Sequence, residues 1–244
     1  MSPKLYRSFQ ALLLLAFGLF LIEKIFSGKL TWYINMRFFP LTLIGIALLI
    51  VMALAIYLHD RLETHEEHAD HEHNTTPLAN LIFLLIPLLI GILIPARPLD
   101  SAAVDSKGVN VSSPLVNSTT STQQMQIAAD QRNILDWIRI FDGNTDVTPY
   151  LGQTANVIGF VYRDDTLPAN QFYVSRFAIV CCAADAVAIG VPVQWDHASA
   201  LAENTWVDVK GPVKSTQLNG HPAPLILADA VDPTKQPDQP YLFP

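Results

Sequence analysis

The sequence predicts an α + β protein in which three N-terminal transmembrane helices precede a C-terminal all-β domain, an OB-like barrel with a short helix before it. Half of the 244 residues are hydrophobic and only 15% are charged, which is a low charge content for a soluble protein. Nearly all the long apolar runs lie before residue 97, whereas the second half contains short alternating segments of the kind that form β-strands. We therefore expect a transmembrane unit at 1–98, a Ser/Thr-rich linker at 99–125 and a folded domain at 126–244.

Three apolar runs define the predicted membrane unit, at about 9–26, 38–58 and 78–96. The second run has 21 residues without a charge. At roughly 1.5 Å per residue such a helix spans about 31 Å, the thickness of a bilayer core. The third run contains Pro87, which a membrane helix tolerates when neighbouring helices satisfy the freed carbonyl groups. These runs predict a multi-pass protein of the cell membrane.

The first apolar run also fits the hydrophobic region of a signal peptide, because Lys4 and Arg7 precede it. Glu23 and Lys24 follow it, however, where a signal peptide would have a cleavage site formed by small residues. We therefore prefer a membrane span.

With the N-terminus inside, three basic residues lie on the inner side and four on the outer side, so the positive-inside rule does not decide the topology. The low-charge linker favours an extracytoplasmic C-terminal domain.

The second half predicts a short amphipathic helix followed by five strands. Apolar residues recur on one helical face of 127–141, and we expect this helix to pack on the β-domain. The expected strands are 154–162, 172–181, 187–194, 205–213 and 224–230, separated by segments that contain Gly, Pro, Asn or Asp. A helical turn at 196–201 would lie between the third and fourth strands, which is the order of an OB-like barrel. An irregular β-sandwich is the alternative.

The segment 59–77, between the second and third apolar runs, contains five of the seven histidines. Several are spaced three residues apart, so that on one helical face their imidazoles can chelate zinc, copper or nickel, with acidic neighbours adding attraction for a cation. The spacing matches no defined zinc motif. A solvated loop without a ligand and a pH-sensing segment are the alternatives. The candidate ligands in this loop are His59, His65, His68, His71 and His73.

Cys181 and Cys182 are the only cysteines, and because they are adjacent they cannot join distant elements. Neighbouring residues of a regular strand point to opposite faces, so both sulfur atoms can bind one ion only if the chain turns there. If it does, the two thiolates together with Asp185, or with a distant histidine (His197 or His221), can hold a soft metal. The alternatives are a buried thiol beside a surface thiol, without a ligand, and thiol redox chemistry.

The sequence contains no complete catalytic constellation. Ser175 and Ser199 lack a nucleophile elbow, and there is no glycine-rich phosphate loop, so we expect the protein not to be an enzyme. The formal net charge of −7 argues against a nucleic-acid partner, because a phosphate backbone requires a basic face. We expect Arg176, in the strand before the cysteines, to form a structural ion pair with Asp164 or Asp185.

Residues 159–191, GFVYRDDTLPANQFYVSRFAIVCCAADAVAIGV, are similar to the signature of the YcgQ-like bacterial membrane proteins. The His-bearing segment 59–73, the Pro-x-x-Pro-Leu element at 95–99 and the tail at 240–244 match the layout of the same family. This resemblance implies N-terminal spans, a C-terminal β-domain and a YcgR-like polytopic permease as partner, with metal ions as the cargo of the pair.

These observations favour a membrane-anchored accessory subunit of a permease, linked to the handling of divalent metal ions. The expected ligand is zinc or another divalent transition metal, and the expected partners are a YcgR-like permease and membrane lipid. A thiol-dependent redox or envelope enzyme that uses Cys181 and Cys182 is one alternative. A structural membrane scaffold is the other.

Overall fold

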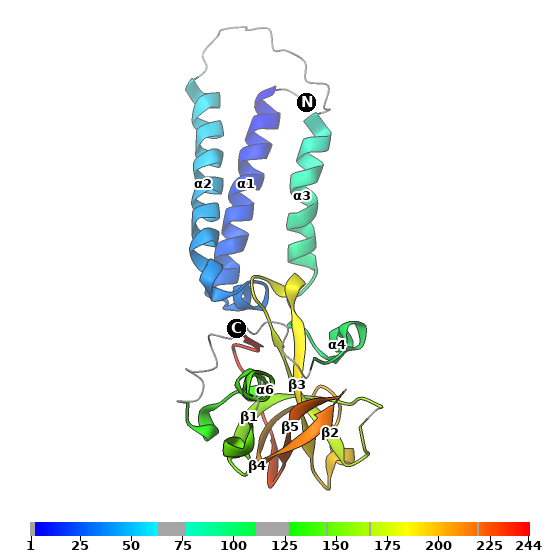
Figure 1. Ribbon diagram of the computed structural model, residues 1–244. Coiled ribbons are helices and arrows are strands. Elements are labelled where there is room, and N and C mark those ends of the chain that lie inside the picture. Colours follow the sequence, from blue (N-terminus) through cyan, green and yellow to red (C-terminus); the bar gives the residue numbers. More distant parts are fainter. Residues whose placement is uncertain (1–2, 63–76, 111–126, 145, 166, 219) are drawn as a thin grey trace. The chain divides into compact units, whose positions relative to one another are not determined.

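The computed structural model describes all residues except 1–2, 63–76, 111–126, 145, 166 and 219 (Figure 1). The chain divides into two compact units, Met1–Arg97 and Pro98–Pro244. The first unit is helical, and the second contains a mixed β-sheet with short helices. The predicted α + β class is therefore confirmed.

The first unit consists of α1 (Pro3–Phe26), α2 (Phe39–Leu62) and α3 (Pro77–Leu93). In Figure 1, α1 lies between the other two helices, and it contacts both of them. The chain passes from α1 to α2 through two short 3-10 helices, η1 (Lys29–Trp32) and η2 (Met36–Phe38). These helices correspond to the three predicted apolar runs.

Two of the described helical stretches, Lys4–Phe26 and Met36–His59, are long and apolar enough to cross a membrane, and the apolar stretch Leu81–Leu93 is shorter. Large apolar side chains on all three helices are exposed, among them Leu12, Leu41 and Phe83. Such contiguous apolar surface is unfavourable in water and is typical of contact with lipid or with another membrane protein. The first unit is therefore membrane-associated.

The sheet of the second unit contains β1 (Thr154–Tyr162), β2 (Gln171–Ala178), β3 (Val187–Gln194), β4 (Trp206–Leu218), β5 (His221–Leu227), β6 (Ala230–Pro233) and β7 (Tyr241–Leu242). The bounds of β1 and β3 agree with the predicted strands. The predicted strand 172–181 ends earlier, at Ala178, and the predicted strand 224–230 is divided between β5 and β6.

The strand pairings follow one another in a ring, from β1 to β2, β3, β5, β4 and back to β1. The β3–β5 pair is parallel and the other four pairs are antiparallel. Two further strands extend this arrangement, because β6 pairs with β4 and β7 pairs in parallel with the end of β2.

The predicted helix at 127–141 is shorter in the structure, where α6 spans Ile134–Gly143. Asn133 is the N-cap of α6. Its side chain accepts the N–H of Asp136 at 3.2 Å, and the Asp136 carboxylate accepts the N–H of Asn133 at 3.0 Å. Such a capping box marks a helix N-terminus. Trp137 of α6 is fully buried in the same core as the strand residues, so the helix packs on the sheet as predicted.

Part of the predicted linker at 99–125 is folded. The helix α4 (Ser101–Lys107) is capped at its N-terminus by Asp100, and its Val104 is fully buried. The Leu99 N–H donates to the Tyr241 hydroxyl at 2.9 Å, and the Asn110 N–H donates to a carbonyl of β3 at 2.9 Å. Residues 98–110 therefore belong to the second unit, and residues 111–125 of the predicted linker lie outside the described residues.

Candidate metal site at the turn between β2 and β3

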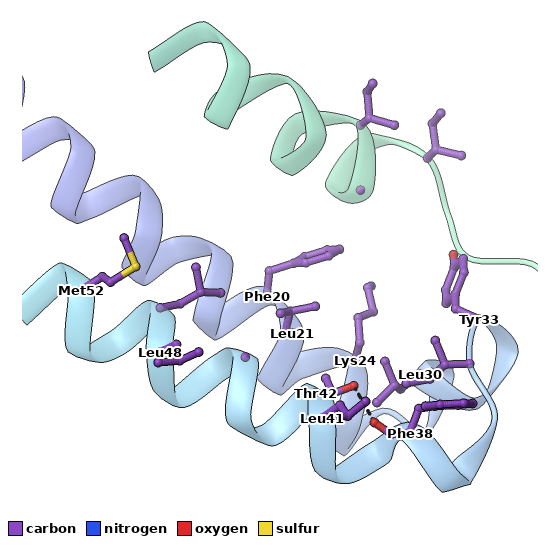
Figure 2. Close-up of a pocket in the computed structure, with 16 residues that line it drawn as sticks. Phe20, Leu21, Lys24, Leu30, Tyr33, Phe38, Leu41, Thr42, Leu48 and Met52 are labelled. Carbon is purple, nitrogen blue, oxygen red and sulfur yellow. Dashed lines mark hydrogen bonds between the residues drawn. The ribbon is translucent and has the colours of Figure 1, made fainter. Parts of the chain in front are cut away.

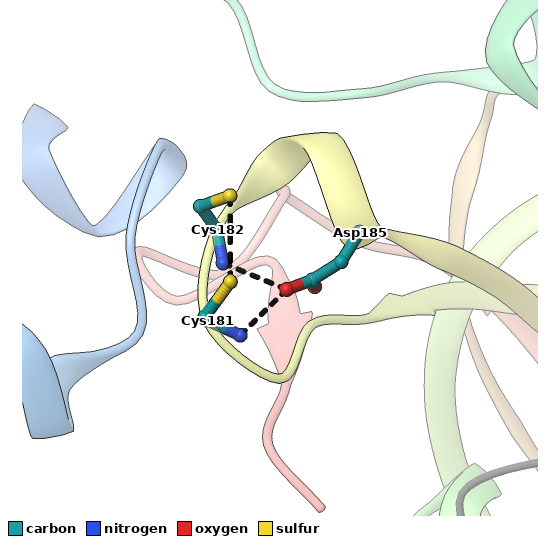
Figure 3. A group of neighbouring side chains, drawn as sticks. All are labelled: Cys181, Cys182 and Asp185. Atoms are coloured by element: carbon teal, nitrogen blue, oxygen red, sulfur yellow. Dashed lines mark hydrogen bonds between the residues drawn. The ribbon is translucent and has the colours of Figure 1, made fainter.

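The two cysteines lie in a tight turn and not on a strand. After β2 ends at Ala178, the chain forms the 3-10 helix η5 (Ala183–Asp185) before it enters β3. The Asp185 N–H donates to the Cys182 carbonyl at 3.0 Å, which closes this turn. The sulfur atoms of Cys181 and Cys182 are 3.6 Å apart. The sequence predicted that both sulfur atoms can bind one ion only if the chain turns at the cysteines. The structure has this turn (Figure 3).

Asp185 holds the turn together through backbone N–H groups. Its Oδ1 accepts the N–H of Val180 at 2.9 Å. Its Oδ2 accepts the N–H groups of Cys181 at 2.8 Å and Cys182 at 3.1 Å, as Figure 3 shows for the cysteines. Hydrogen bonds to an ionised acceptor are stronger than neutral ones. The carboxylate therefore organises the backbone on which both thiols stand.

The three side chains form a compact donor set. The two sulfur atoms and a carboxylate oxygen of Asp185 all lie within 4.8 Å of one another. Both cysteines are free thiols, with Cys181 exposed and Cys182 half-buried. Two sulfur donors and one oxygen donor suit a borderline or soft transition-metal ion. We call Cys181, Cys182 and Asp185 the CCD cluster.

The cluster changes the protonation of its own members. The hydrogen bond with the Asp185 carboxylate, followed by the hydrogen bond with Cys182, raises the pKa of the Cys181 thiol to about 12. For Asp185, burial alone would raise the pKa, but the hydrogen bonds from the Cys181 side chain and from the three backbone N–H groups outweigh it and lower the pKa. At neutral pH the carboxylate is therefore ionised and the Cys181 thiol is protonated.

The predicted histidine ligands are only partly described. His59 lies in α2 and is exposed, whereas His65, His68, His71 and His73 lie outside the described residues. The structure therefore brings together the cysteines and Asp185, and the role of the histidine loop stays a prediction.

Arg176 has partners other than the predicted carboxylates. Its guanidinium donates to the backbone carbonyls of Gln239 and Pro240, and it lies 5.9 Å from the centre of the Trp206 ring. Burial lowers the pKa of Arg176 to about 10. This arginine therefore fixes the C-terminal tail beside β2. The sequence carried no signal for these contacts, because the two acceptors lie more than sixty residues away.

The first unit contains an apolar groove of about 940 Å³ between its helices (Figure 2). Phe20 and Leu48 line it, together with Lys24 at one end. The Lys24 ammonium lies 4.8 Å from the centre of the Phe20 ring and forms a 2.8 Å ion pair with Glu23. The groove offers an apolar surface suited to helix packing.

Comparison with protein families places these features in a known group. Residues 9–110 match the DUF1980 N-terminal domain, and residues 110–244 match the DUF1980 C-terminal domain. The chain belongs to the DUF1980 family. The boundary between the two DUF1980 domains falls at residue 110, so the N-terminal family domain includes α4, which in the structure belongs to the second unit.

The DUF1980 chain is similar to two relatives over most of its length. One is the UPF0703 protein YcgQ of Bacillus subtilis, with 26% identity over 96% of this chain and 99% of the relative. The other, from Streptococcus mutans, is named "Putative two-component membrane permease complex subunit", with 25% identity over 89% of this chain and 92% of the relative. No solved structure matches the DUF1980 chain. The predicted resemblance to the YcgQ-like proteins is confirmed, and neither relative is named as an enzyme.

Proposed function

We propose that this protein is a membrane-anchored accessory subunit of a permease that handles divalent transition-metal ions, and that the CCD cluster is its metal site. The Streptococcus mutans relative is named as a permease complex subunit, which supports the accessory role. The observation that carries the metal assignment is the convergence of two free thiols and a carboxylate within 4.8 Å.

In this proposal the N-terminal part crosses the cell membrane three times, with the C-terminal domain on the extracytoplasmic side. The exposed apolar side chains of α1, α2 and α3 would contact lipid and a YcgR-like polytopic permease. The second unit would be an OB-like barrel, which the ring of strand pairings with a parallel β3–β5 pair supports. The loop with His59, His65, His68, His71 and His73 would collect ions on the other side of the membrane.

Co-purification tests the accessory role. The tagged full-length chain is extracted in detergent from its native membrane, and co-purifying proteins and bound metals are identified by mass spectrometry and elemental analysis. We expect a polytopic membrane protein and a transition metal in comparable amounts. Recovery of the chain alone, with no membrane partner after cross-linking in the membrane, would contradict the subunit assignment.

A thiol-dependent redox protein is the second candidate, because the sulfur atoms are 3.6 Å apart and Cys181 is exposed. In this chemistry the two thiols would form a disulfide while a disulfide of a partner is reduced to two thiols. Incubation with glutathione disulfide, followed by thiol labelling, tests it. If the protein is a redox protein, labelling of both thiols should be lost together and should return after a reductant is added. Thiols that remain fully labelled would contradict the redox function.

A further inference from the structure

We infer that the CCD cluster is an open tetrahedral site for a zinc-class ion, preorganised without the ion, which takes its fourth ligand from outside the cluster. This inference rests on the proposed function and names the kind of ion and the kind of site. It distinguishes a site that exchanges its ion from one that holds the fold together.

The spacing of the sulfur atoms is compatible with a tetrahedral ion. Two thiolates bound to one tetrahedral ion at about 2.3 Å have sulfur atoms roughly 3.8 Å apart, whereas a linear arrangement separates them by about 4.6 Å. The observed distance is 3.6 Å. It is therefore close to the tetrahedral value, so the two thiols need to move little to bind Zn²⁺ or Co²⁺, whereas a linear Cu⁺ centre requires them to move apart by about 1 Å. Mg²⁺ and Ca²⁺, which require oxygen ligands, are excluded by the two sulfur atoms.

Asp185 can supply the third ligand without releasing the turn. A carboxylate offers about four lone-pair sites, and three of them accept the N–H groups of Val180, Cys181 and Cys182. The Cys181 side chain forms a hydrogen bond with the same carboxylate. A cation that replaces the thiol proton therefore lies between a sulfur atom and an oxygen atom that already face each other.

The fourth coordination position is open to the surroundings. In the described part of the chain, the group contains three donor side chains, and Cys181 is exposed. Structural zinc sites are typically closed by four protein ligands, whereas sites with three protein ligands keep a position for water or another molecule. Hydrogen bonds from three N–H groups to Asp185 hold the backbone of the turn. Both features favour a site that receives and releases its ion.

Titration of the full-length chain with Co²⁺ tests the inference. The chain is purified in detergent under reducing, oxygen-free conditions, with His59, His65, His68, His71 and His73 changed to Ala so that the histidine loop does not contribute. We expect one equivalent of Co²⁺ to give a thiolate-to-cobalt charge-transfer band and intense tetrahedral d–d bands. Zn²⁺ should displace the Co²⁺, and an excess of Mg²⁺ should not.

Single substitutions assign the spectrum to the cluster. Cys181→Ser and Cys182→Ser should each reduce the charge-transfer intensity by about half or more and weaken binding. Asp185→Asn keeps an acceptor for the turn but loses the anionic ligand, and we expect at least tenfold weaker binding, because removal of a group that only supports a ligand already costs about tenfold or more. Asp165→Asn, at an exposed aspartate outside the cluster, is the matched control and should bind normally.

Imidazole tests the open position. Added to the Co²⁺-loaded chain, it should shift the d–d bands without removing the charge-transfer band, because it occupies the fourth position. Bands that do not respond to imidazole would overturn the open site, and binding that survives both cysteine substitutions would overturn the cluster as the site. These measurements use the isolated chain, so their failure is distinct from a failure to find a permease partner.

Discussion

Asp185 is the residue on which the turn between β2 and β3 depends, because its carboxylate accepts three backbone N–H groups. The same carboxylate hydrogen-bonds to the Cys181 thiol and raises the pKa of that thiol to about 12. One side chain therefore sets both the backbone conformation of the turn and the protonation of the cysteine that it presents. The sequence pointed to the three residues but could not predict this coupling, which depends on the backbone conformation at Cys182.

We expect Asp185→Ala to lower the free energy of unfolding of the second unit by about 1 kcal/mol, because three N–H groups, two of them exposed, exchange a charged acceptor for water. Urea unfolding followed by tryptophan fluorescence measures the change. The pKa of Asp185 is lower in the folded chain than its ordinary value of 3.8, so its contribution is present above pH 3.8 and is lost as the pH falls through the folded-state pKa. The difference between the wild type and Asp185→Ala should therefore disappear in acid.

Alkylation of Cys181 should respond to Asp185 in a Cys182→Ser background. The thiolate is the reactive form, and the hydrogen bond with Asp185 is the largest cause of the raised pKa. Asp185→Asn should lower the pKa of Cys181 and so increase the fraction of reactive thiolate at pH 8. Because each unit of pKa changes this fraction about tenfold, we expect the reaction with iodoacetamide to be at least tenfold faster. Mass spectrometry at timed intervals measures the rate. An unchanged rate, equal to that of Asp165→Asn, would contradict this account.

At the scale of elements, the packing of α1 against α3 depends on a glycine. A Cβ atom added at Gly91 would lie 2.7 Å from the Phe20 ring, closer than carbon atoms approach in proteins. A Cβ atom added at Gly45, in the apolar part of α2, would have no neighbouring atom within 4 Å. The two glycines therefore have different roles, although both stand in apolar helices where the sequence alone does not distinguish them.

We expect Gly91→Ala to destabilise the first unit by about 1 kcal/mol, the low end for an overpacked site, because the tip of the Phe20 ring must move. Gly45→Ala is the matched control and should be neutral or slightly stabilising, because alanine has a higher helix propensity than glycine. Thermal unfolding in detergent, followed by circular dichroism, compares the variants. Phe20→Leu combined with Gly91→Ala should recover part of the loss. Equal effects of the two alanine substitutions would show that α1 and α3 do not pack in this way.

At the scale of the whole molecule, the two ends of the second unit are joined. Leu99, in the first residues of that unit, donates its N–H to the hydroxyl of Tyr241, 142 residues later. Arg176 binds the carbonyls that immediately precede Tyr241, and the Tyr241 ring contacts Phe177 edge-on. Leu99, the last residue of the Pro-x-x-Pro-Leu element, is therefore joined to the C-terminal tail within the second unit.

Tyr241→Phe should lower the free energy of unfolding of the second unit by about 1 kcal/mol, because the Leu99 N–H loses its acceptor. We also expect faster amide exchange in residues 98–110, measured by hydrogen–deuterium exchange with mass spectrometry. Phe243→Leu, in the same tail, is the control for a general effect of changing the terminus. Unchanged exchange in 98–110 would contradict the role of this contact.

The sequence by itself determined the helical membrane unit and most of the strands, including the bounds of β1 and β3, because apolar length and alternation are local properties of the chain. The tertiary structure decided the partners of Arg176, the folding of 98–110 onto the second unit, and the meeting of both thiols with Asp185. These features depend on backbone turns and on contacts between distant residues. Neither leaves a periodic pattern in the sequence.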